Sequence, residues 1–217
     1  MISILMPIYN GIEFIHDSVM SIVEQRYTNW ELFIGINGHP PSSDVLKIAQ
    51  KYAELHTNIR VYDMVNSKGK SDTLNQMLTY CNYEWISLLD VDDIWRPDKL
   101  EKQVPYMKMY DVIGTNCRYF GNLNVCPSIP LGDISGVDFR NVNPIINSSC
   151  LLKKSLCWWD SNYDGIEDYD LWLRLWKNKC KFYNVPEILV LHRIHPESAF
   201  NAKGNHINVN ALIAKFK

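Results

Sequence analysis

The sequence lacks any apolar stretch long enough to cross a membrane. A spanning helix needs about 18 consecutive apolar residues, whereas the hydrophobic residues, 47% of the total, are spread along all 217 positions. The amino-terminal stretch MISILMPIYNG has no basic segment, and its apolar segment is too short for a secretion signal. These absences predict a cytoplasmic protein with no membrane span.

An excess of positive charge and paired cysteine motifs are missing as well. The net charge is −2 and the isoelectric point is about 6.3, so the composition gives no indication of a nucleic-acid partner. The six cysteines are scattered without a C-x-x-C pair, which favours reduced thiols over disulfides. No repeat or low-complexity segment interrupts the chain, and its length suits one large domain or two small ones.

Apolar runs and helical patterns alternate four times in the first hundred residues. The apolar runs predict buried strands at 2–8, 31–36, 59–64 and 85–89. Helical spacing after them predicts helices at 11–26, at 42–55, at 71–81 and from Pro97 onward. Because the strands are continuously apolar rather than alternating, we expect a parallel sheet with helices on both faces. Ligands of such sheets bind beyond the carboxyl ends of the strands.

The second half of the sequence is less regular. Its patterns predict strands at 111–120, 144–152 and 187–195 and a helix at 169–178. The residues after Asn201 form a short tail, which we expect to be the most mobile part of the chain.

Three carboxylates crowd the end of the fourth predicted strand. Asp90, Asp92 and Asp93 all lie within the stretch LLDVDDIW. Carboxylates this close repel one another, so a positive partner is expected between them. A divalent cation fits, because Mg²⁺ and Mn²⁺ prefer oxygen ligands. The alternative is helix capping, in which Asp92 or Asp93 precedes the helix at Pro97 and favours its positive end.

Six short motifs follow one another along the chain. The first three are PIYNG (7–11), SIVEQ (21–25) and NSKG (66–69). The last three are LDVDD (89–93), continued by IWRPDKLEKQ, then EDYDLWLRL (167–175) and HRIHPES (192–198). In this order they resemble the motifs of the family 2 glycosyltransferases, inverting enzymes of the GT-A type that use nucleotide-sugars. The resemblance covers nearly the whole chain.

The resemblance implies an α/β fold with a GT-A-like, Rossmann-type, mainly parallel sheet flanked by helices in a single domain over 1–217. Residues 1–100 would bind the nucleotide-sugar, 101–200 would bind the acceptor, and 201–217 would form a carboxyl-terminal tail. The implied reaction transfers a sugar, from a UDP-sugar and with inversion, to an acceptor hydroxyl in the presence of Mn²⁺ or Mg²⁺. The implied acceptor is a glycan, a glycolipid or a glycoprotein, and the enzyme would act as a monomer or a homodimer.

The resemblance also assigns roles to individual residues. Asp92 and His195 would bind the metal, with Asp93 behind them, and Asp168 would be the general base that takes the proton of the acceptor hydroxyl. Phosphate contacts are expected from His192 and Arg193. The donor site would contain Pro7, Tyr9, Asn37, Ser71, Asp90, Val91 and Asp92.

The acceptor side would contain Glu167 and an aromatic wall. Of the adjacent Trp158 and Trp159, one is expected in the core and the other against the apolar face of a sugar ring, a role assigned here to Trp159. A plainer interpretation remains open for Glu167 and Asp168, because any carboxylate at the start of a helix is favoured by the helix dipole.

One motif departs from the family pattern. Where the family has D-D-G-S after the second strand, this chain has INGH (36–39). Asn37 keeps one acceptor oxygen for a uracil base and adds a donor, so UDP remains the expected nucleotide. The change also leaves open a catalytically inactive relative that only binds nucleotide-sugars.

A sugar nucleotidyltransferase is the third hypothesis, and it ranks below the other two. Such enzymes carry a glycine-rich loop with Arg and Lys near the first strand, and PIYNGIEF has neither. The chain also lacks the Q-x-x-R-W signature of processive polysaccharide synthases, which favours transfer of single sugars.

Overall fold

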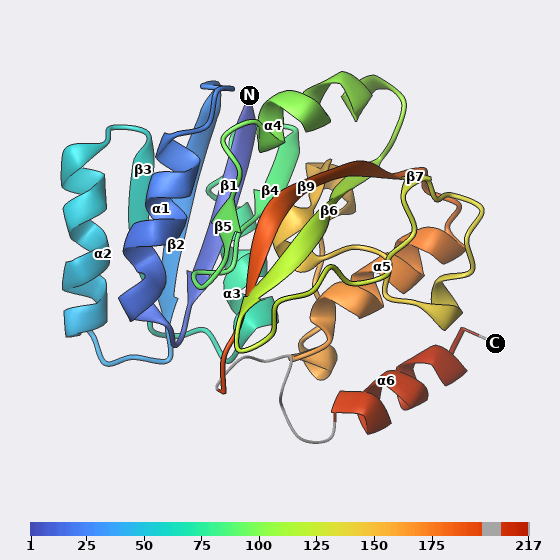
Figure 1. The fold of residues 1–217 in the computed structure, drawn as a ribbon. Coiled ribbons are helices and arrows are strands. Elements are labelled where there is room, and N and C mark those ends of the chain that lie inside the picture. The colour runs from blue at the N-terminus through green and yellow to red at the C-terminus, as the bar shows by residue number, and fades with distance from the viewer. Residues whose placement is uncertain (197–204, 217) are drawn as a thin grey trace.

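The computed structural model describes residues 1–196 and 205–216. Within these ranges nine strands form one sheet, in the order β3-β2-β1-β4-β8-β6-β9-β5, with β7 pairing to β9 (Figure 1). The first four strands of that order are parallel and come from the first half of the chain: β3 (Ile59–Met64), β2 (Trp30–Asn37), β1 (Ile2–Ile8) and β4 (Trp85–Leu88).

The sheet reverses direction where the second half of the chain begins. β8 (Leu151–Lys153) runs antiparallel to both of its neighbours, β4 and β6 (Val112–Gly121). The long β9 (Phe182–Ile194) is parallel to β6, and two short strands pair antiparallel to it, β5 (Ile94–Trp95) and β7 (Gly132–Asp133).

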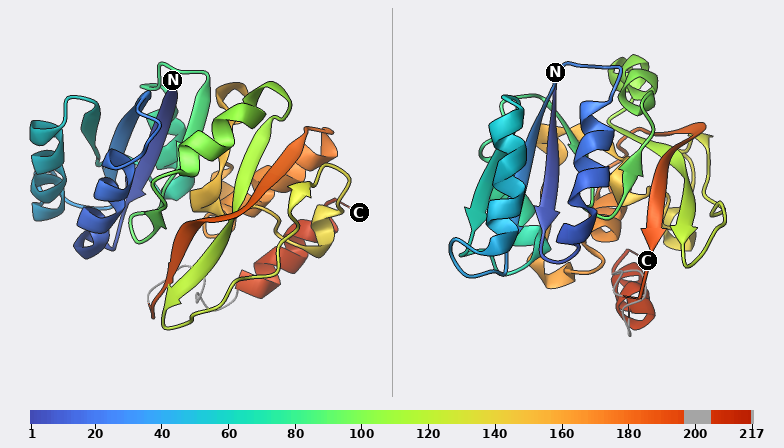
Figure 2. Two further views of the ribbon diagram at one scale, coloured as in Figure 1. Left: turned by 45° about the horizontal axis from the view of Figure 1, so that its top comes forward. Right: turned by 60° about the vertical axis from the view of Figure 1, so that its left-hand side comes forward.

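Helices cover both faces of the sheet, as the views in Figure 2 show. One face packs against α1 (Ile15–Val23), α2 (Asp44–Leu55) and α4 (Lys99–Gln103). The other packs against α3 (Lys70–Leu78), α5 (Glu167–Lys177) and α6 (Asn205–Ala214). Short 3-10 helices connect these elements at Ile12–Phe14, Val104–Lys108, Phe139–Asn141, Asn147–Ser149, Lys154–Leu156 and Ser161–Tyr163.

The apolar runs explain why the central strands are buried on both faces. In β1, Ile4 and Met6 pack into the core under α1 and α2, while Leu5 between them packs into the core under α3 and α5. A strand that faces helices on both sides has no solvated face, so its sequence cannot alternate. None of the helices in the described residues is long and apolar enough to cross a lipid bilayer.

Four details of the predicted elements differ in the structure. The helix expected from Pro97 begins two residues later, with Asp98 at its N-cap position. The strand expected at 144–152 is reduced to β8, because Asn147–Ser149 instead forms a 3-10 helix. The two-residue strands β5 and β7 have no counterpart among the predicted elements.

The predicted tail is partly helical. Residues 201–204 lie outside the described part of the chain, but α6 follows directly, and Leu212 on it is 1% exposed in the core beside α5. The described part of the tail therefore contains a helix that packs against the rest of the domain.

Candidate functional site

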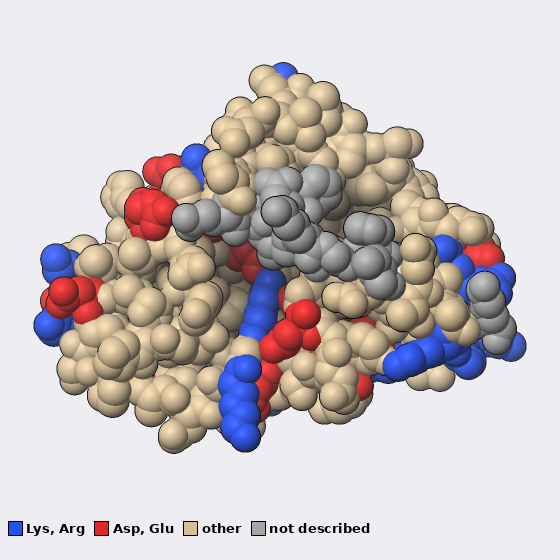
Figure 3. Space-filling view, turned by 90° about the horizontal axis from the view of Figure 1, so that it is seen from below, with Lys and Arg blue, Asp and Glu red and all other residues tan. Residues whose placement is uncertain are grey.

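The predicted donor residues gather where the parallel strands end. Tyr9 follows β1, Asn37 is the last residue of β2, and Asp90 comes two residues after β4. The carboxyl ends of these strands lie along one edge of the sheet, the lower edge in Figure 1. Figure 3 views the molecule from this side and shows basic and acidic side chains together in a hollow.

Asp90 is held by a cation and an amide. Lys70 Nζ donates to Asp90 Oδ1 at 2.7 Å, and Asn147 Nδ2 donates to Oδ2 at 3.0 Å. The backbone N–H of Asp90 donates to Ser148 Oγ at 3.0 Å. Burial raises the pKa of Asp90, but the Lys70 charge and these hydrogen bonds outweigh it, so the pKa lies below its ordinary value. Asp90 is therefore a fixed, ionised acceptor.

Asp92 and His195, the two residues expected to bind a metal, lie side by side. Asp92 Oδ2 is 3.1 Å from His195 Nε2, and both side chains keep about one fifth of their surface exposed (21% and 20%). Burial, together with repulsion from Asp93 and Asp90, raises the pKa of Asp92 to about 6. A site that raises a carboxylate's pKa in this way is one where a cation would be stabilised.

These two residues alone could supply only part of a coordination shell. No cluster of three or more His, Cys, Asp or Glu side chains that could hold a metal occurs among the described residues. Mg²⁺ and Mn²⁺ commonly take one or two protein ligands and fill the remaining positions with phosphate and water oxygens. The donor set of Asp92 and His195 fits an ion of that kind.

Asp93 is a structural anchor for the end of β9. It is fully buried, and its carboxylate lies 2.8 Å from His192 Nδ1 and accepts from the backbone N–H of Arg193 at 2.8 Å. Burial lowers the pKa of His192, but the Asp93 charge outweighs it and raises the value to about 9. Arg193 Nε also donates to the Asp92 carbonyl at 2.9 Å. The contacts described for these two cations thus hold the loop that carries Asp92.

Asp168 lies in the first turn of α5, next to Glu167. Burial, followed by repulsion from Glu167, raises the pKa of Asp168 to about 6. Asn143 Nδ2 donates to Asp168 Oδ2 at 3.4 Å. Glu167 accepts from the backbone N–H of Gly165 at 2.7 Å and lies 3.3 Å from Lys70 Nζ. Lys70 thus bridges Asp90 and Glu167, and despite burial these acids raise its pKa well above the ordinary value.

One cavity of about 650 Å³ connects the two sets of acids. Asp90 and Lys70 line it on the side of the parallel strands, and Glu167 and Asp168 line it on the side of α5. The rest of its wall comes mostly from the second half of the chain, including Tyr119, Ile129, Arg140, Asn143, Ile145, Asn147, Tyr169, His192, Val209 and Ile213.

The remaining donor-site predictions lie near this edge but do not line the cavity. The Tyr9 side chain is 58% exposed. A Cβ atom at position 38 would come within 2.2 Å of the Tyr9 ring, so only glycine fits at that position. Asn37 is 4% exposed at the end of β2, and Pro7 and Val91 flank the same edge.

Ser71 is buried beneath the loop that precedes α5. Its backbone N–H donates to Asp164 Oδ1 at 2.9 Å, and its hydroxyl donates to the Asp160 carbonyl at 3.4 Å. The contacts described for Ser71 therefore join α3 to the acceptor half.

Trp159 corrects one prediction. Its side chain is 1% exposed in the core, and its backbone N–H donates to Asn75 Oδ1 at 3.0 Å. A ring buried this deeply cannot stack on a sugar, so the assignment of Trp159 to the acceptor side is wrong. Trp158 is the exposed member of the pair, with the Arg174 guanidinium 5.0 Å from its ring.

Three residues of the site were not predicted: Lys70, Asn143 and Asn147. Lys70 follows the NSKG motif directly, so its position at the start of α3 was within reach of the sequence. The two asparagines lie in irregular segments before β8, where no periodicity marks them.

Comparison with known proteins now identifies the class. A model of the family described as glycosyl transferase family 2 matches residues 3–143. The chain is 30% identical, over 216 residues, to the O-antigen biosynthesis glycosyltransferase WbnJ of Escherichia coli, with 91% of this chain and 81% of WbnJ covered. The chain therefore belongs to glycosyltransferase family 2.

Solved structures bear out the predicted fold. TarS of S. aureus, in complex with UDP-GlcNAc, is similar with a TM-score of 0.79 at 15% identity over 99% of this chain. The mannosyltransferase PcManGT from Pyrobaculum calidifontis, in complex with GDP-Man and Mn²⁺, gives 0.71 at 15% identity over 91%. The chain spans 66% and 58% of the lengths of those two chains. These likenesses confirm the GT-A fold.

Proposed function

We propose that this glycosyltransferase moves a sugar from a UDP-sugar to an acceptor hydroxyl with inversion, with the help of a divalent metal. The observation that carries the proposal is the shared cavity, which has a fixed donor-side carboxylate, Asp90, at one side and a second acid, Asp168, at the other. An inverting reaction needs the nucleophile and the leaving group on opposite faces of the sugar, and so needs one cavity open to both.

The metal would be held by Asp92 and His195. When bound, Mn²⁺ or Mg²⁺ would neutralise the charge that develops on the leaving diphosphate. The repulsion among Asp90, Asp92 and Asp93 supports this assignment, because a cation relieves it. Arg193 and Asp93 would keep Asp92 in place through the loop contacts described above.

Asp168 would act as the general base. With a pKa of about 6 it is mostly ionised near neutral pH, yet it binds protons more readily than an ordinary aspartate. Its carboxylate would take the proton of the acceptor hydroxyl as that oxygen attacks the anomeric carbon. A single displacement of this kind inverts the anomeric centre, and no covalent enzyme intermediate is needed.

The donor would lie along the strand ends. Pro7, Tyr9, Asn37, Ser71, Asp90 and Val91 would form its nucleoside side, with Asp90 accepting a hydrogen bond from ribose or from a metal-bound water. The UDP-GlcNAc of the TarS complex supports a UDP-sugar, whereas the GDP-Man of PcManGT is the competing choice. The acceptor would be a glycan, glycolipid or glycoprotein that enters beside Glu167, and the name of WbnJ, which refers to O-antigen biosynthesis, agrees with a glycan.

Release of nucleotide from a panel of nucleotide-sugars, with and without Mn²⁺, tests the proposal. We expect the enzyme to release nucleotide from a UDP-sugar. This release should depend on the metal and should persist after gel filtration of the enzyme. A larger release from GDP-sugars would overturn the donor assignment. Full turnover in excess EDTA would overturn the proposed dependence on a divalent metal. Binding of UDP without any transfer would favour the inactive relative.

A further inference from the structure

One short segment of the second half holds Asp90. Asn147 Nδ2 donates to both oxygens of the Asp90 carboxylate, at 3.2 and 3.0 Å. Ser148 Oγ accepts from the Asp90 backbone N–H at 3.0 Å and lies 3.4 Å from Asp90 Oδ2. Both residues belong to the 3-10 helix Asn147–Ser149. The hydrogen bonds inside such a short helix are poor, so its position depends on the groups packed around it.

Three buried side chains hold three consecutive backbone carbonyls of this segment, those of residues 148–150. Trp95 Nε1 donates to the first carbonyl at 2.7 Å, Gln103 Nε2 donates to the second at 2.8 Å, and Ser87 Oγ donates to the third at 2.6 Å. The three donors come from β5, α4 and β4 and are at most 2% exposed. Because a buried carbonyl without a partner is costly, these bonds fix the segment in one place.

Lys99 on α4 contacts all three of these donors. Its Nζ donates to Gln103 Oε1 at 2.9 Å and to Ser87 Oγ at 3.4 Å, and it lies 3.7 Å from the centre of the Trp95 ring. An ammonium group only donates hydrogen bonds. Lys99 therefore turns the Gln103 amide so that its Nε2 faces the carbonyls, and it leaves the Ser87 hydroxyl hydrogen free to point at its own carbonyl.

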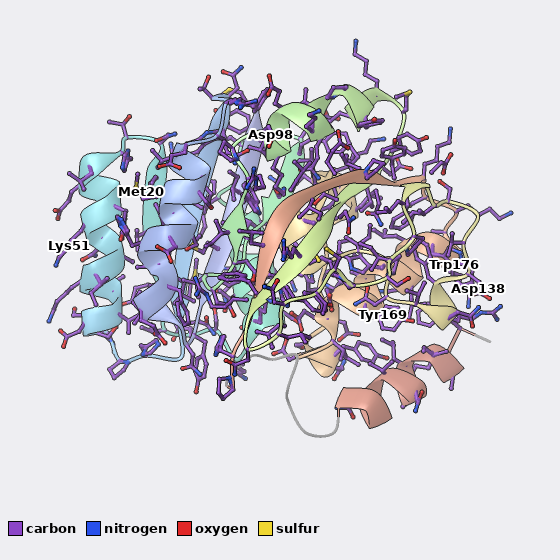
Figure 4. All side chains as sticks on the ribbon, viewed as in Figure 1. Met20, Lys51, Asp98, Asp138, Tyr169 and Trp176 are labelled. Atoms are coloured by element: carbon purple, nitrogen blue, oxygen red, sulfur yellow. The ribbon has the colours of Figure 1, made fainter. Side chains whose placement is uncertain are left out.

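Lys99 is fully buried, and the contacts described for it include no carboxylate. Burial lowers the pKa of Lys99 to about 7. A lysine buried without an acid costs stability, and a residue that breaks the usual rules in this way is expected where function requires it. Neither Lys99 nor its three partners line the cavity. Figure 4 shows Asp98, at the N-cap of α4, in the upper part of the molecule and Tyr169, which lines the cavity, in the lower part.

We propose that Lys99 is a positioning residue of the donor site, which fixes the Asp90 carboxylate through its three contacts and the segment 147–150. Lys99 touches neither the donor nor the metal. It acts through Asn147 and Ser148, whose side chains reach Asp90 on the other side of the segment. The inference rests on the proposed function only in treating Asp90 as an acceptor on the donor side.

Lys99→Met tests the proposal, because methionine keeps an unbranched side chain and removes every donor. The KM for the donor and the Kd of UDP with Mn²⁺ should rise by about tenfold, the loss expected for a weakened hydrogen bond to a charged group. The kcat should change much less than the KM. A role in folding alone predicts the reverse, since a smaller active fraction lowers kcat and leaves KM unchanged. That result would overturn the proposal.

Ser87→Ala repeats the test with the loss of a single oxygen, and it decides the question if Lys99→Met does not fold. It should weaken UDP binding by about threefold. The matched control is Ser3→Ala on the neighbouring strand β1, where an equally buried hydroxyl donates to Glu31 Oε1 at 2.7 Å instead. Thermal unfolding checks that each variant is folded. Equal weakening of UDP binding in both variants would contradict a specific role for the segment 147–150.

Hydrogen exchange without nucleotide separates this inference from the proposed function. Lys99→Met should speed exchange in peptides that span 85–93 and 144–152, and it should leave β2 unchanged. Unchanged exchange in both peptides would overturn the positioning role. If exchange becomes faster but the unaltered chain binds no UDP, the donor assignment fails and the positioning of Asp90 by Lys99 stands.

A double variant tests the route through Asn147. If Lys99 acts on Asp90 through this residue, Lys99→Met combined with Asn147→Ala should weaken UDP binding by less than the product of the two single losses. Calorimetry on the two single variants and the double variant measures this. A loss equal to the full product would mean that Lys99 and Asn147 act independently, and the proposed route would be wrong.

Discussion

The two halves of the molecule build the same cavity by different means. In the first half, neighbouring parallel strands end along one edge of the sheet and bring Tyr9, Asn37 and Asp90 there, and of these Asp90 lines the cavity. In the second half, irregular segments and the start of α5 deliver Asn143, Asn147 and Asp168. The regular half offers a fixed donor surface that follows from sheet geometry, whereas the second half depends on loops whose positions come from packing.

Lys70 connects the two halves electrostatically. It starts α3 in the first half, yet it lies 2.7 Å from Asp90 and 3.3 Å from Glu167 of the second half. The donor-side acid and the acceptor-side acids therefore share one cation. If the two halves act separately, a substitution in one half should leave the properties measured for the other half unchanged. If Lys70 couples them, the measurements should move together.

The largest effect is expected at the metal site. Asp92→Ala should abolish transfer and also weaken binding of UDP in the presence of Mn²⁺, because an ion held by Asp92 would contact the diphosphate. Turnover and the UDP-induced thermal shift measure the two effects. Asp44→Ala, an exposed residue at the start of α2, is the control. Unchanged affinity for UDP with Mn²⁺ would mean that Asp92 has only a structural role.

Asp168→Asn should lower kcat by roughly 100-fold or more, the usual contribution of a general base, with UDP binding preserved. Asp170→Asn removes a charge from the same helical turn, but Asp170 pairs with Arg174 instead of lining the cavity. If the Asp168 carboxylate only favours the helix start, Asp168→Asn loses about 1 kcal/mol or less of stability and, like Asp170→Asn, keeps normal kcat. Melting temperature and kcat of the same preparations decide between these outcomes.

The pH dependence of kcat sharpens the comparison. A base must be ionised to work, so kcat should fall about tenfold per pH unit below the pKa of Asp168, which is about 6. The Lys70 charge lowers that pKa, so Lys70→Met should move the acidic limb to higher pH, and Lys70→Arg should restore it. If the acidic limb of the pH profile of kcat does not shift in Lys70→Met, the two halves are electrostatically independent.

The asparagines separate the two sides. Asn147→Ala removes a 3.0 Å hydrogen bond to Asp90 and should weaken donor binding by about tenfold, the lower end for a bond to a charged group. Asn143→Ala removes the longer contact to Asp168 and should lower kcat by less, with donor affinity unchanged. Calorimetry with UDP measures the donor affinity of the two variants, and steady-state kinetics measures their kcat. The same response in both variants would contradict this division.

The same contrast explains what the sequence could predict. β1 and β3 match their predicted limits, because continuous apolar runs bounded by turns mark buried strands. The run at 144–152 is equally apolar in part, yet Asn147 and Ser148 leave the strand pattern to bond Asp90. Periodicity records which residues face the core, but it carries no information on a partner more than fifty positions away.

Site residues divide in the same way. The positions of Asp90, Asp92 and Asp168 in the fold could be predicted because each follows a regular element or begins one. Trp159 was placed wrongly because adjacent aromatic residues give no sign of which one is buried. In the structure, Asn75 on α3 accepts its backbone N–H and so holds it inside.

The smallest expected effect on activity lies at Glu31, a buried residue of β2 in the first half. Glu31 accepts hydrogen bonds from Ser3 Oγ at 2.7 Å, from Arg60 Nη1 at 2.8 Å and from the backbone N–H of Asn82 at 3.2 Å. Burial raises its pKa, but these bonds outweigh it, so the pKa lies below the ordinary 4.5. The ionised carboxylate therefore stabilises the fold above that value, and this contribution is lost as the pH falls through the lowered pKa.

Glu31→Gln should reduce the free energy of unfolding by about 1–3 kcal/mol near neutral pH, the usual range for hydrogen bonds to a buried charge. The difference from the unaltered chain should shrink as the pH falls from 4.5 through the lowered pKa of Glu31, because Glu31 becomes neutral only below that lowered pKa. Urea unfolding at several pH values measures it, and Glu54→Gln on the exposed side of α2 is the control. The kcat of the folded variant should stay unchanged, since Glu31 does not line the cavity. A loss that is the same at every pH would mean that side-chain packing, and not the charge of Glu31, stabilises this part of the first half.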